Sequence, residues 1–250
     1  MAAGIALVTG AGSGIGRGCA LALLAEGWQV VFLGRREPPL KDAIASAGEQ
    51  AAQGLALPCD VSDAAAVDAA FDQLRQRYGR LDLLFNNAGV SLPNQLPGDL
   101  AIADWKRAVD INLHGAYHCL AAAFRLMRTQ QPMGGRIINN GSISAHSPRP
   151  GSIAYTATKH AISGLTRAAS LDGRPFDIAV GQIDIGNVAS DMTEKMMAGV
   201  AQADGSIRPE PRMELQAVVD TFMAMARLPL SANMLFTTVM ATRMPYVGRG

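Results

Sequence analysis

The stretch of sequence that decides the fold reads Thr9-Gly10-Ala11-Gly12-Ser13-Gly14-Ile15-Gly16. It joins a β-rich run at residues 5–9 to a segment with helical spacing at residues 15–26. Glycines in a strand-to-helix turn let the backbone approach a diphosphate, and the following helix presents the positive end of its dipole. The turn is therefore typical of a dinucleotide-binding fold, although such turns also serve packing alone.

Strand and helix patterns alternate along the rest of the chain. Strands are expected at residues 5–9, 29–33, 54–58, 81–85, 136–140, 176–183 and 235–240, and helices at 15–26, 40–50, 63–78, 104–129, 152–171 and 214–228. This alternation predicts an α/β fold with a doubly wound parallel sheet (a Rossmann fold) of about seven strands, as one domain over residues 1–250. Residues 184–212 show no clear helical or strand periodicity, and we expect them to form a substrate lid.

The composition narrows the functional classes. Of 250 residues, 49% are hydrophobic, and 22 basic against 21 acidic side chains give a net charge of +1. This balance argues against a nucleic-acid surface or a basic membrane face. No apolar run approaches the ~18 residues that span a bilayer, and residues 1–10 lack a charged leader. We therefore expect a cytoplasmic protein whose three cysteines are buried thiols.

The side chains most suggestive of chemistry are Tyr155, Lys159 and Ser142. Tyr155 and Lys159 are one helical turn apart, so the phenol and the ammonium are expected to share a face. An adjacent ammonium favours the phenolate, and lowering the pKa of tyrosine by about 3 units takes roughly 4 kcal/mol. The pattern predicts a proton-transfer group that works near neutral pH. The alternative is a solvated pair on a helix surface.

Three further motifs accompany this set. Asp60-Val61 follows the third strand, Asn86-Asn87-Ala88-Gly89 closes the fourth, and Asn112 lies within the long helix. Together with the glycine turn, Ser142, Tyr155 and Lys159, these motifs resemble the short-chain dehydrogenase/reductase family over about residues 4–192. The resemblance implies an oxidoreductase that transfers a hydride between a nicotinamide and a carbonyl or secondary alcohol.

The resemblance also implies a role for each matching position. The catalytic residues would be Asn112, Ser142, Tyr155 and Lys159. Cofactor contacts would come from Gly10, Ser13, Gly14, Ile15, Gly16, Arg35, Asp60, Val61, Asn87, Ala88, Gly89, Tyr155, Lys159, Gly186, Val188 and Ser190. Asn112 would bend its helix by bonding a main-chain carbonyl and would hold a relay water, while Asn87 would chiefly brace the sheet.

The choice of coenzyme is predicted from Gly34-Arg35-Arg36-Glu37. In such folds an acid after the second strand accepts hydrogen bonds from the ribose 2′-hydroxyl, whereas an arginine accepts a 2′-phosphate. Here glycine stands where the acid is expected and Arg35 follows it, which favours NADP(H). NAD(H) is the alternative, because Glu37 could turn inward or the arginines could be solvated.

The sequence departs from the family pattern after the sixth predicted strand. Relatives usually carry Pro-Gly after the sixth strand and a threonine four residues beyond the glycine. Here Ile185 replaces the proline and Ser190 the threonine, and Asp184 adds an unusual acid. We expect the loss of proline to free this turn. His146 lies near the predicted pocket rim and could touch substrate.

Several functions remain compatible with these motifs. A 3-oxoacyl thioester reductase is one candidate; the alternatives are an NAD-dependent alcohol or sugar dehydrogenase, a decarboxylase or epimerase, and a non-catalytic cofactor-binding sensor. We expect a small-molecule carbonyl or alcohol substrate and no metal, although His114 and His118 share a helix face with Asp110. Alanine-rich faces on the helices at 104–129 and 152–171 suggest a homotetramer or homodimer.

Overall fold

The computed structural model describes residues 4–189 and 199–247. Its centre is a seven-stranded sheet in the order β3-β2-β1-β4-β5-β6-β9, and every adjacent pair is parallel. The strands are β1 (Ile5–Thr9), β2 (Gln29–Gly34), β3 (Gly54–Pro58), β4 (Leu83–Asn86), β5 (Gly135–Asn140), β6 (Ile178–Ile185) and β9 (Phe236–Val239). The strand order reverses between β1 and β4, and ligands bind such sheets at the carboxyl ends beside that point.

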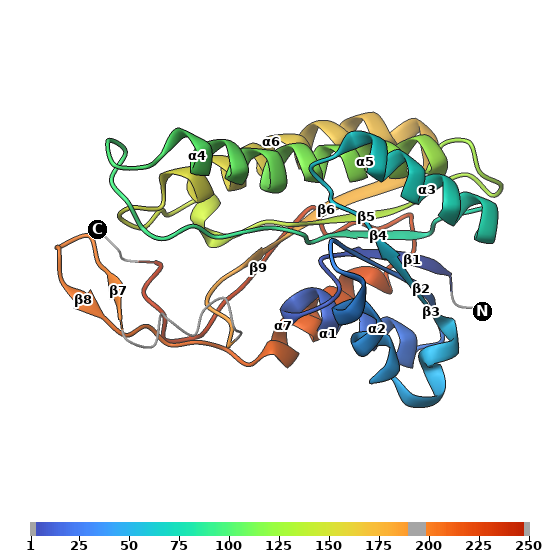
Figure 1. Cartoon of the computed structure of the whole chain (residues 1–250), viewed down its shortest axis with the longest axis horizontal. Coiled ribbons are helices and arrows are strands. Elements are labelled where there is room, and N and C mark those ends of the chain that lie inside the picture. Colours follow the sequence, from blue (N-terminus) through green and yellow to red (C-terminus); the bar gives the residue numbers. More distant parts are fainter. Residues whose placement is uncertain (1–3, 190–198, 248–250) are drawn as a thin grey trace.

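Helices cover both faces of the sheet (Figure 1). One face carries α1 (Gly14–Ala25), α2 (Glu37–Ala45) and α7 (Leu215–Ala226). The other carries α3 (Ala64–Tyr78), α4 (Ile102–Val109), α5 (Gly115–Met127) and α6 (Ile153–Gly173). The predicted doubly wound parallel fold is therefore confirmed.

Alternating strand residues build a separate core on each face. Val8, Phe32 and Phe85 pack with α1 and α7, and the Phe85 and Phe222 rings lie 4.5 Å apart. Leu7 and Leu84 point the other way and pack with α3 and α5. Both sides of these strands are apolar because both are covered, which is typical of a parallel sheet.

Two predicted helices differ from the structure. The helix expected at 40–50 begins at Glu37, because Pro38 and Pro39 are tolerated in a first turn, and ends at Ala45. Gly48, with φ of +61°, then opens a 3₁₀ segment at Gly48–Gln53. The helix expected at 104–129 is two α-helices joined by a π-helical turn at Asp110–His114.

The segment predicted as a lid is partly ordered into strands. β6 continues to Ile185, so Asp184 and Ile185 belong to the sheet rather than to the irregular stretch. A short antiparallel hairpin follows, formed by β7 (Val200–Ala201) and β8 (Ile207–Arg208). Residues 190–198 of the expected lid lie outside the described residues.

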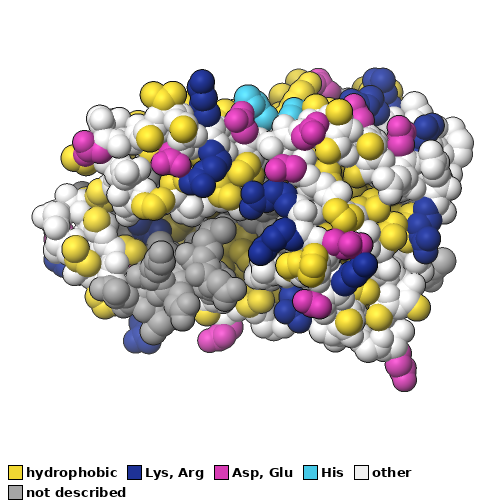
Figure 2. All heavy atoms as spheres, viewed as in Figure 1, with side chains coloured by type: hydrophobic (Ala, Val, Ile, Leu, Met, Phe, Trp, Pro, Cys, Tyr) yellow, Lys and Arg dark blue, Asp and Glu magenta, His cyan; other side chains and the backbone are white. Residues whose placement is uncertain are grey.

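The surface and the cysteines agree with the composition. Acidic and basic side chains are interspersed over the face seen in Figure 2. In the described portion of the chain, no helix is long and apolar enough to cross a membrane. Cys19, Cys59 and Cys119 are buried free thiols, as predicted, and burial together with Asp60 and Asp63 raises the pKa of Cys59 to about 11.

One buried hydroxyl fixes the chain at the switch point. The Thr9 Oγ1 atom accepts hydrogen bonds from the backbone N–H groups of Asn87 and Ala88, both at 2.8 Å. Thr9 has no exposed surface. These two amides have just left β4, so the threonine sets where the chain turns away from the sheet.

Replacing Thr9 with Val should therefore destabilise the protein. The substitution keeps the shape but leaves two partly buried amides without an acceptor, which costs about 2–4 kcal/mol of unfolding free energy. Urea denaturation measures the loss. Thr9→Ser, which keeps the hydroxyl, should recover most of it; equal losses in both variants would contradict this account.

Candidate active site

Tyr155 and Lys159 share a face of α6, as their spacing predicts. The Lys159 Nζ atom lies 5.5 Å from the centroid of the Tyr155 ring. Lys159 is only 6% exposed, and its Nζ donates a hydrogen bond of 2.7 Å to the Asn140 carbonyl at the end of β5. The ammonium is thus fixed beside the half-buried phenol at the carboxyl end of the sheet.

A chain of side-chain amides links this lysine to the glycine turn. The Asn140 Nδ2 group donates to Asn87 Oδ1 at 2.8 Å, and Asn87 Nδ2 donates to the Thr9 carbonyl at 2.9 Å. Asn87 therefore braces β1 against β5, as predicted. Sequence reasoning missed Asn140 and Thr9, although both end a strand beside a predicted motif.

Ser142 lies just after β5 and is 5% exposed. It caps a 3₁₀ turn at Ile143–Ala145, where its Oγ accepts from the Ser144 N–H at 3.1 Å. Its own N–H donates to Asp184 Oδ1 at 3.0 Å. Because its Oγ is already an acceptor in this turn, the hydroxyl proton remains for a substrate oxygen.

Asn112 bonds a main-chain carbonyl, as predicted, and lies where the helix departs from regular α-helical geometry. Its side chain does not bond its own helix but crosses to the loop after β4, where it accepts from Val90 N–H at 2.7 Å and donates to the Val90 carbonyl at 2.9 Å. The helix break is the π-helical turn itself, in which Asn112 sits. Such turns are frequent at functional sites. A weaker bond of 3.4 Å reaches Thr158, one residue before Lys159.

The glycine turn has room for a diphosphate. Gly10 and Gly14 have φ of +67° and +51°, and a Cβ on Gly14 would meet nothing within 4 Å. A Cβ on Gly16 would lie 2.3 Å from the Gly10 carbonyl, so only glycine fits there. Ser13 precedes α1 without a side-chain capping bond, and Ile15 packs against the core. The turn therefore fits a dinucleotide pyrophosphate.

Charges near the predicted adenosine end come from β2 and β3. Burial alone would raise the pKa of Asp60, but hydrogen bonds from Ser62 and the nearby Arg35 hold it below its usual value. Glu37 forms an ion pair with Lys41 at 2.9 Å. Arg35 and Arg36 are exposed and form no ion pair with any described residue.

Val61 is buried, and its carbonyl lies 2.9 Å from His118 Nδ1.

Backbone pairing holds the start of the turn after β6 although the proline is missing, and the greater freedom expected there stays a prediction. Ile185 is 7% exposed and pairs with Val239, and the Gly186 N–H donates to the Val239 carbonyl at 2.9 Å. Val188 is buried and forms a parallel bridge with Met213. Ser190 lies outside the described residues.

A buried polar cluster, which sequence reasoning missed, holds this turn to the hairpin. Glu210 is 8% exposed and accepts from Asn187 Nδ2 at 2.8 Å, from Gln202 Nε2 at 3.0 Å and from Arg149. Arg149 also donates to Asn187 Oδ1 at 2.8 Å. No local motif marks these residues, since they come from four separate loops.

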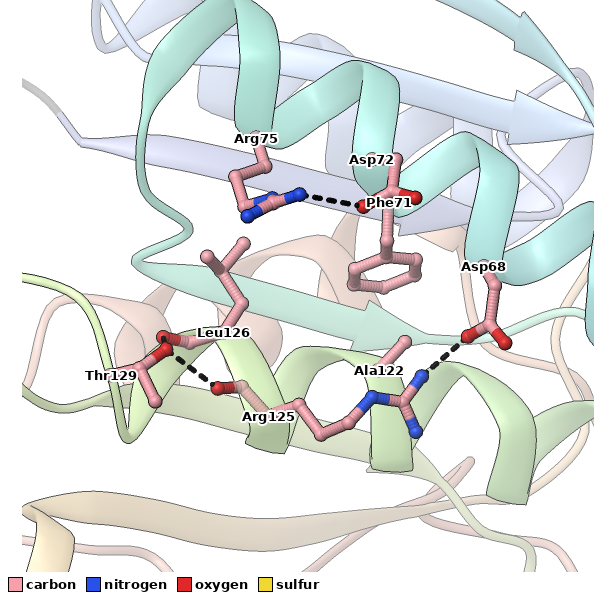
Figure 3. A pocket seen from close by; sticks show the side chains of 8 residues that line it. All are labelled: Asp68, Phe71, Asp72, Arg75, Ala122, Arg125, Leu126 and Thr129. Carbon is pink, nitrogen blue, oxygen red and sulfur yellow. Dashed lines mark hydrogen bonds and ion pairs between the residues drawn. The ribbon is translucent and has the colours of Figure 1, made fainter.

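The histidines do not assemble a metal site. His114 contacts Asp110 at 3.1 Å, and no group of three potential ligands occurs among the described residues. His146 instead bonds Asp184 Oδ2 through Nε2 at 2.8 Å. A groove between α3 and α5, which the Arg125–Asp68 ion pair crosses and the Arg75–Asp72 pair borders on α3, contains none of the predicted site residues (Figure 3).

Comparison with known proteins agrees with this geometry. The family model for short chain dehydrogenases matches residues 4–201. The chain belongs to the short-chain dehydrogenase/reductase family of enzymes, as its motifs predicted.

Individual relatives differ in their substrates. The chain is 37% identical over 196 residues to a 3beta-hydroxysteroid dehydrogenase of Mediterraneibacter gnavus, covering 78% of this chain and 70% of that protein. It is 34% identical over 203 residues to a 3-oxoacyl-[acyl-carrier-protein] reductase of Synechocystis sp., covering 79% of each. A 3-ketoacyl-(acyl-carrier-protein) reductase of Brucella melitensis, solved with NADH, shares the fold with a TM-score of 0.83 and 24% identity over 96% of this chain and 97% of that one.

The Glu210 cluster should make stability depend on pH. Burial would raise the pKa of Glu210, but bonds from Gln202 and Asn187 and the charge of Arg149 lower it below the usual 4.5. A depressed folded pKa contributes stability above the unfolded value and loses it as the pH falls through the folded one. Glu210→Gln should therefore lower the free energy of unfolding most near neutral pH, and this loss should shrink below pH 4.5.

Urea unfolding of the wild type and of Glu210→Gln, from neutral pH to below pH 4.5, measures the difference in their free energies of unfolding. Glu49→Gln, which alters an exposed carboxylate, serves as the control. A difference that stays constant with pH would contradict the cluster's role.

Proposed function

We propose that this protein is an NADP(H)-dependent oxidoreductase that interconverts a carbonyl compound and a secondary alcohol. One observation carries the proposal: the Lys159 ammonium is buried between the Asn140 carbonyl and the Tyr155 ring. A buried ammonium next to a phenol favours the phenolate, which is the base that alcohol oxidation needs. A non-catalytic sensor on this fold has no need of such a pair.

The roles of the residues follow from their positions. The nicotinamide supplies or accepts the hydride when bound, and Gly10, Gly14 and Gly16 would hold its pyrophosphate. Ser142 donates a hydrogen bond from its hydroxyl group to the substrate oxygen and thereby orients the substrate. Tyr155 gives a proton to that oxygen in reduction and takes it back in oxidation. Lys159 stabilises the phenolate between these steps.

Asn112 acts indirectly in this scheme. It holds the loop after β4 through Val90 and, with the π-helical turn, supports the proton relay behind Lys159. Among the remaining predicted contacts, Asp60 and Val61 would flank the adenine, Ala88 and Gly89 the middle of the coenzyme, and Gly186 and Val188 its nicotinamide end.

The coenzyme preference rests on charge at the end of β2. Arg35 is exposed, whereas the Glu37 carboxylate is engaged by Lys41. A guanidinium matches a phosphate with its forked donors, so NADP(H) is favoured over NAD(H).

For the substrate, the named relatives support a ketone or secondary alcohol with apolar character, and a 3-oxoacyl thioester is one such compound. The segment at 184–212 would act as its lid, and α5 and α6 would form the interface of a homodimer or homotetramer. We place the enzyme in the cytoplasm.

Replacing Tyr155 with Phe should reduce turnover by roughly 10²–10⁴-fold, because the proton donor is lost while the ring still packs. NADPH oxidation with a panel of ketones measures turnover, and fluorescence titration checks that coenzyme binding persists. Tyr117→Phe, on the exposed face of α5, should behave like the wild type. Substantial activity in Tyr155→Phe would exclude this mechanism.

Replacing Arg35 with Ser should weaken NADPH binding by about tenfold or more and leave NADH binding little changed, because one charge-assisted hydrogen bond to the 2′-phosphate is lost. Titration of both coenzymes against the wild type and the variant tests this. Arg36→Ser is the matched control. A tenfold preference of the wild type for NADH would refute the assignment.

A further inference from the structure

The loop that follows β3 is held against α5 by two contacts at Val61. A Cβ on Gly115 would lie 2.5 Å from Val61 Cγ2, so the valine side chain packs directly on the backbone of α5. Further along the same helix, His118 Nδ1 lies 2.9 Å from the Val61 carbonyl oxygen. A carbonyl only accepts hydrogen bonds, so Nδ1 carries the shared proton in the neutral imidazole and in the imidazolium alike. The contact therefore needs no particular charge on His118.

The two neighbours of Val61 are fixed without α5. Asp60 Oδ1 accepts from the Ser62 N–H at 3.0 Å and from the Ser62 hydroxyl at 2.7 Å, which closes a turn around the valine. Val61 itself makes none of these bonds. Within residues 4–189 and 199–247 its carbonyl is bonded by His118 alone, and its N–H has no acceptor. Gly115 and His118 therefore determine how this residue is oriented.

The loop lies on the far side of the glycine turn from the proton-transfer pair. In the sheet order β3-β2-β1-β4-β5-β6-β9, the glycine turn follows β1, Lys159 is bonded at the end of β5, and Val61 follows β3. A dinucleotide whose diphosphate lies at such a turn extends one nucleoside to each side of it. The nicotinamide has to reach Tyr155, so the adenosine half would lie toward β2 and β3. The adenine is therefore the part of the coenzyme that would meet this loop.

Two polar groups of the loop are unused and match an edge of adenine. The Val61 N–H donates to no described residue, and Asp60 Oδ2 accepts from none. A backbone amide at a buried residue needs an acceptor, and Val61 is 5% exposed. Adenine presents on one edge a ring nitrogen that accepts and an amino group that donates. The donor and the acceptor that the loop leaves unused are the complement of these two groups.

We propose that His118 is a positioning residue for the coenzyme, which holds the adenine-binding loop through the Val61 carbonyl. Besides its hydrogen, the Val61 Cα carries a side chain, a carbonyl and an amide nitrogen. Gly115 fixes the first and His118 the second, so the direction of the N–H is set as well. This inference rests on the proposed function, which supplies the coenzyme, and it adds a residue that acts on coenzyme binding without touching the coenzyme.

A matched pair of variants keeps or removes this single hydrogen bond. His118→Asn places an amide N–H where Nδ1 lies, whereas His118→Leu has nearly the same shape as asparagine and no donor. The ligands are adenosine diphosphate and inosine diphosphate, which differ only in the base. Calorimetric titration measures the ratio of their dissociation constants, and thermal unfolding measures stability. His114→Leu, which alters an exposed side chain one turn away, is the control.

The wild type and His118→Asn should bind adenosine diphosphate more tightly than inosine diphosphate. His118→Leu should weaken the binding of adenosine diphosphate by about fivefold, the worth of one neutral hydrogen bond, and leave the affinity for inosine diphosphate nearly unchanged. His114→Leu should match the wild type. If His118→Leu does not fold, His118→Gln, which moves the donor to the position of Nε2, takes its place with the same expectation.

A purely structural histidine predicts that His118→Leu lowers the melting temperature while the ratio of the two dissociation constants stays that of the wild type. That result would overturn the proposal, as would equal losses of affinity in the Asn and Leu variants, or a wild type that does not distinguish the two bases. None of these titrations uses turnover. If no ketone or alcohol changes the NADPH or NADH absorbance, the proposed function fails, while the titrations still decide the role of His118.

Discussion

The rest of the site depends on burying one ammonium group, that of Lys159. Removing an ammonium from water costs several kcal/mol unless hydrogen bonds replace its hydration. Lys159 is 6% exposed, and one of its three donors is satisfied by the Asn140 carbonyl at 2.7 Å. The position of that carbonyl therefore decides where the charge sits relative to Tyr155. A shift of the end of β5 would move the ammonium away from the phenol, even with α6 intact.

This requirement explains the amides at the strand ends. Asn140 is held by Asn87, and Asn87 is held by Thr9, so β1, β4 and β5 end in one connected polar structure. Buried polar networks rigidify a structure only when their members are satisfied, and here each amide side chain has a backbone or side-chain partner. Asn87 also lies against the glycine turn, where a Cβ on Gly10 would be 3.1 Å from its Nδ2 atom. The proton-transfer pair and the diphosphate turn are therefore positioned by one scaffold.

The sequence predicts whatever depends on local spacing. Residues four apart on a helix share a face, so the Tyr155–Lys159 pair was found, and apolar runs between glycine turns gave the parallel sheet. It does not predict contacts that long loops bring together: His146 and Asp184 are 38 residues apart, and Arg149 and Glu210 are 61 apart. The π-helical turn at Asp110–His114 was missed because its residues fit an uninterrupted helix. Within this turn, Asn112 is bonded to the distant loop at Val90, a contact that spacing alone does not reveal.

The end of β6, where Ile185 stands in place of the proline of the family pattern, places an acidic side chain on the substrate side of the sheet. Ile185 is the last residue of β6 and pairs with Val239, and side chains along a strand alternate between its faces. Ile183 and Ile185 pack in the core with α1 and α7, so Asp184 points to the opposite face together with Gln182. There its carboxylate meets Gly141, where a Cβ would lie 2.0 Å from Oδ1. Asp184 and Gly141 thus act together: the first supplies the carboxylate, and the second makes room for it beside Ser142.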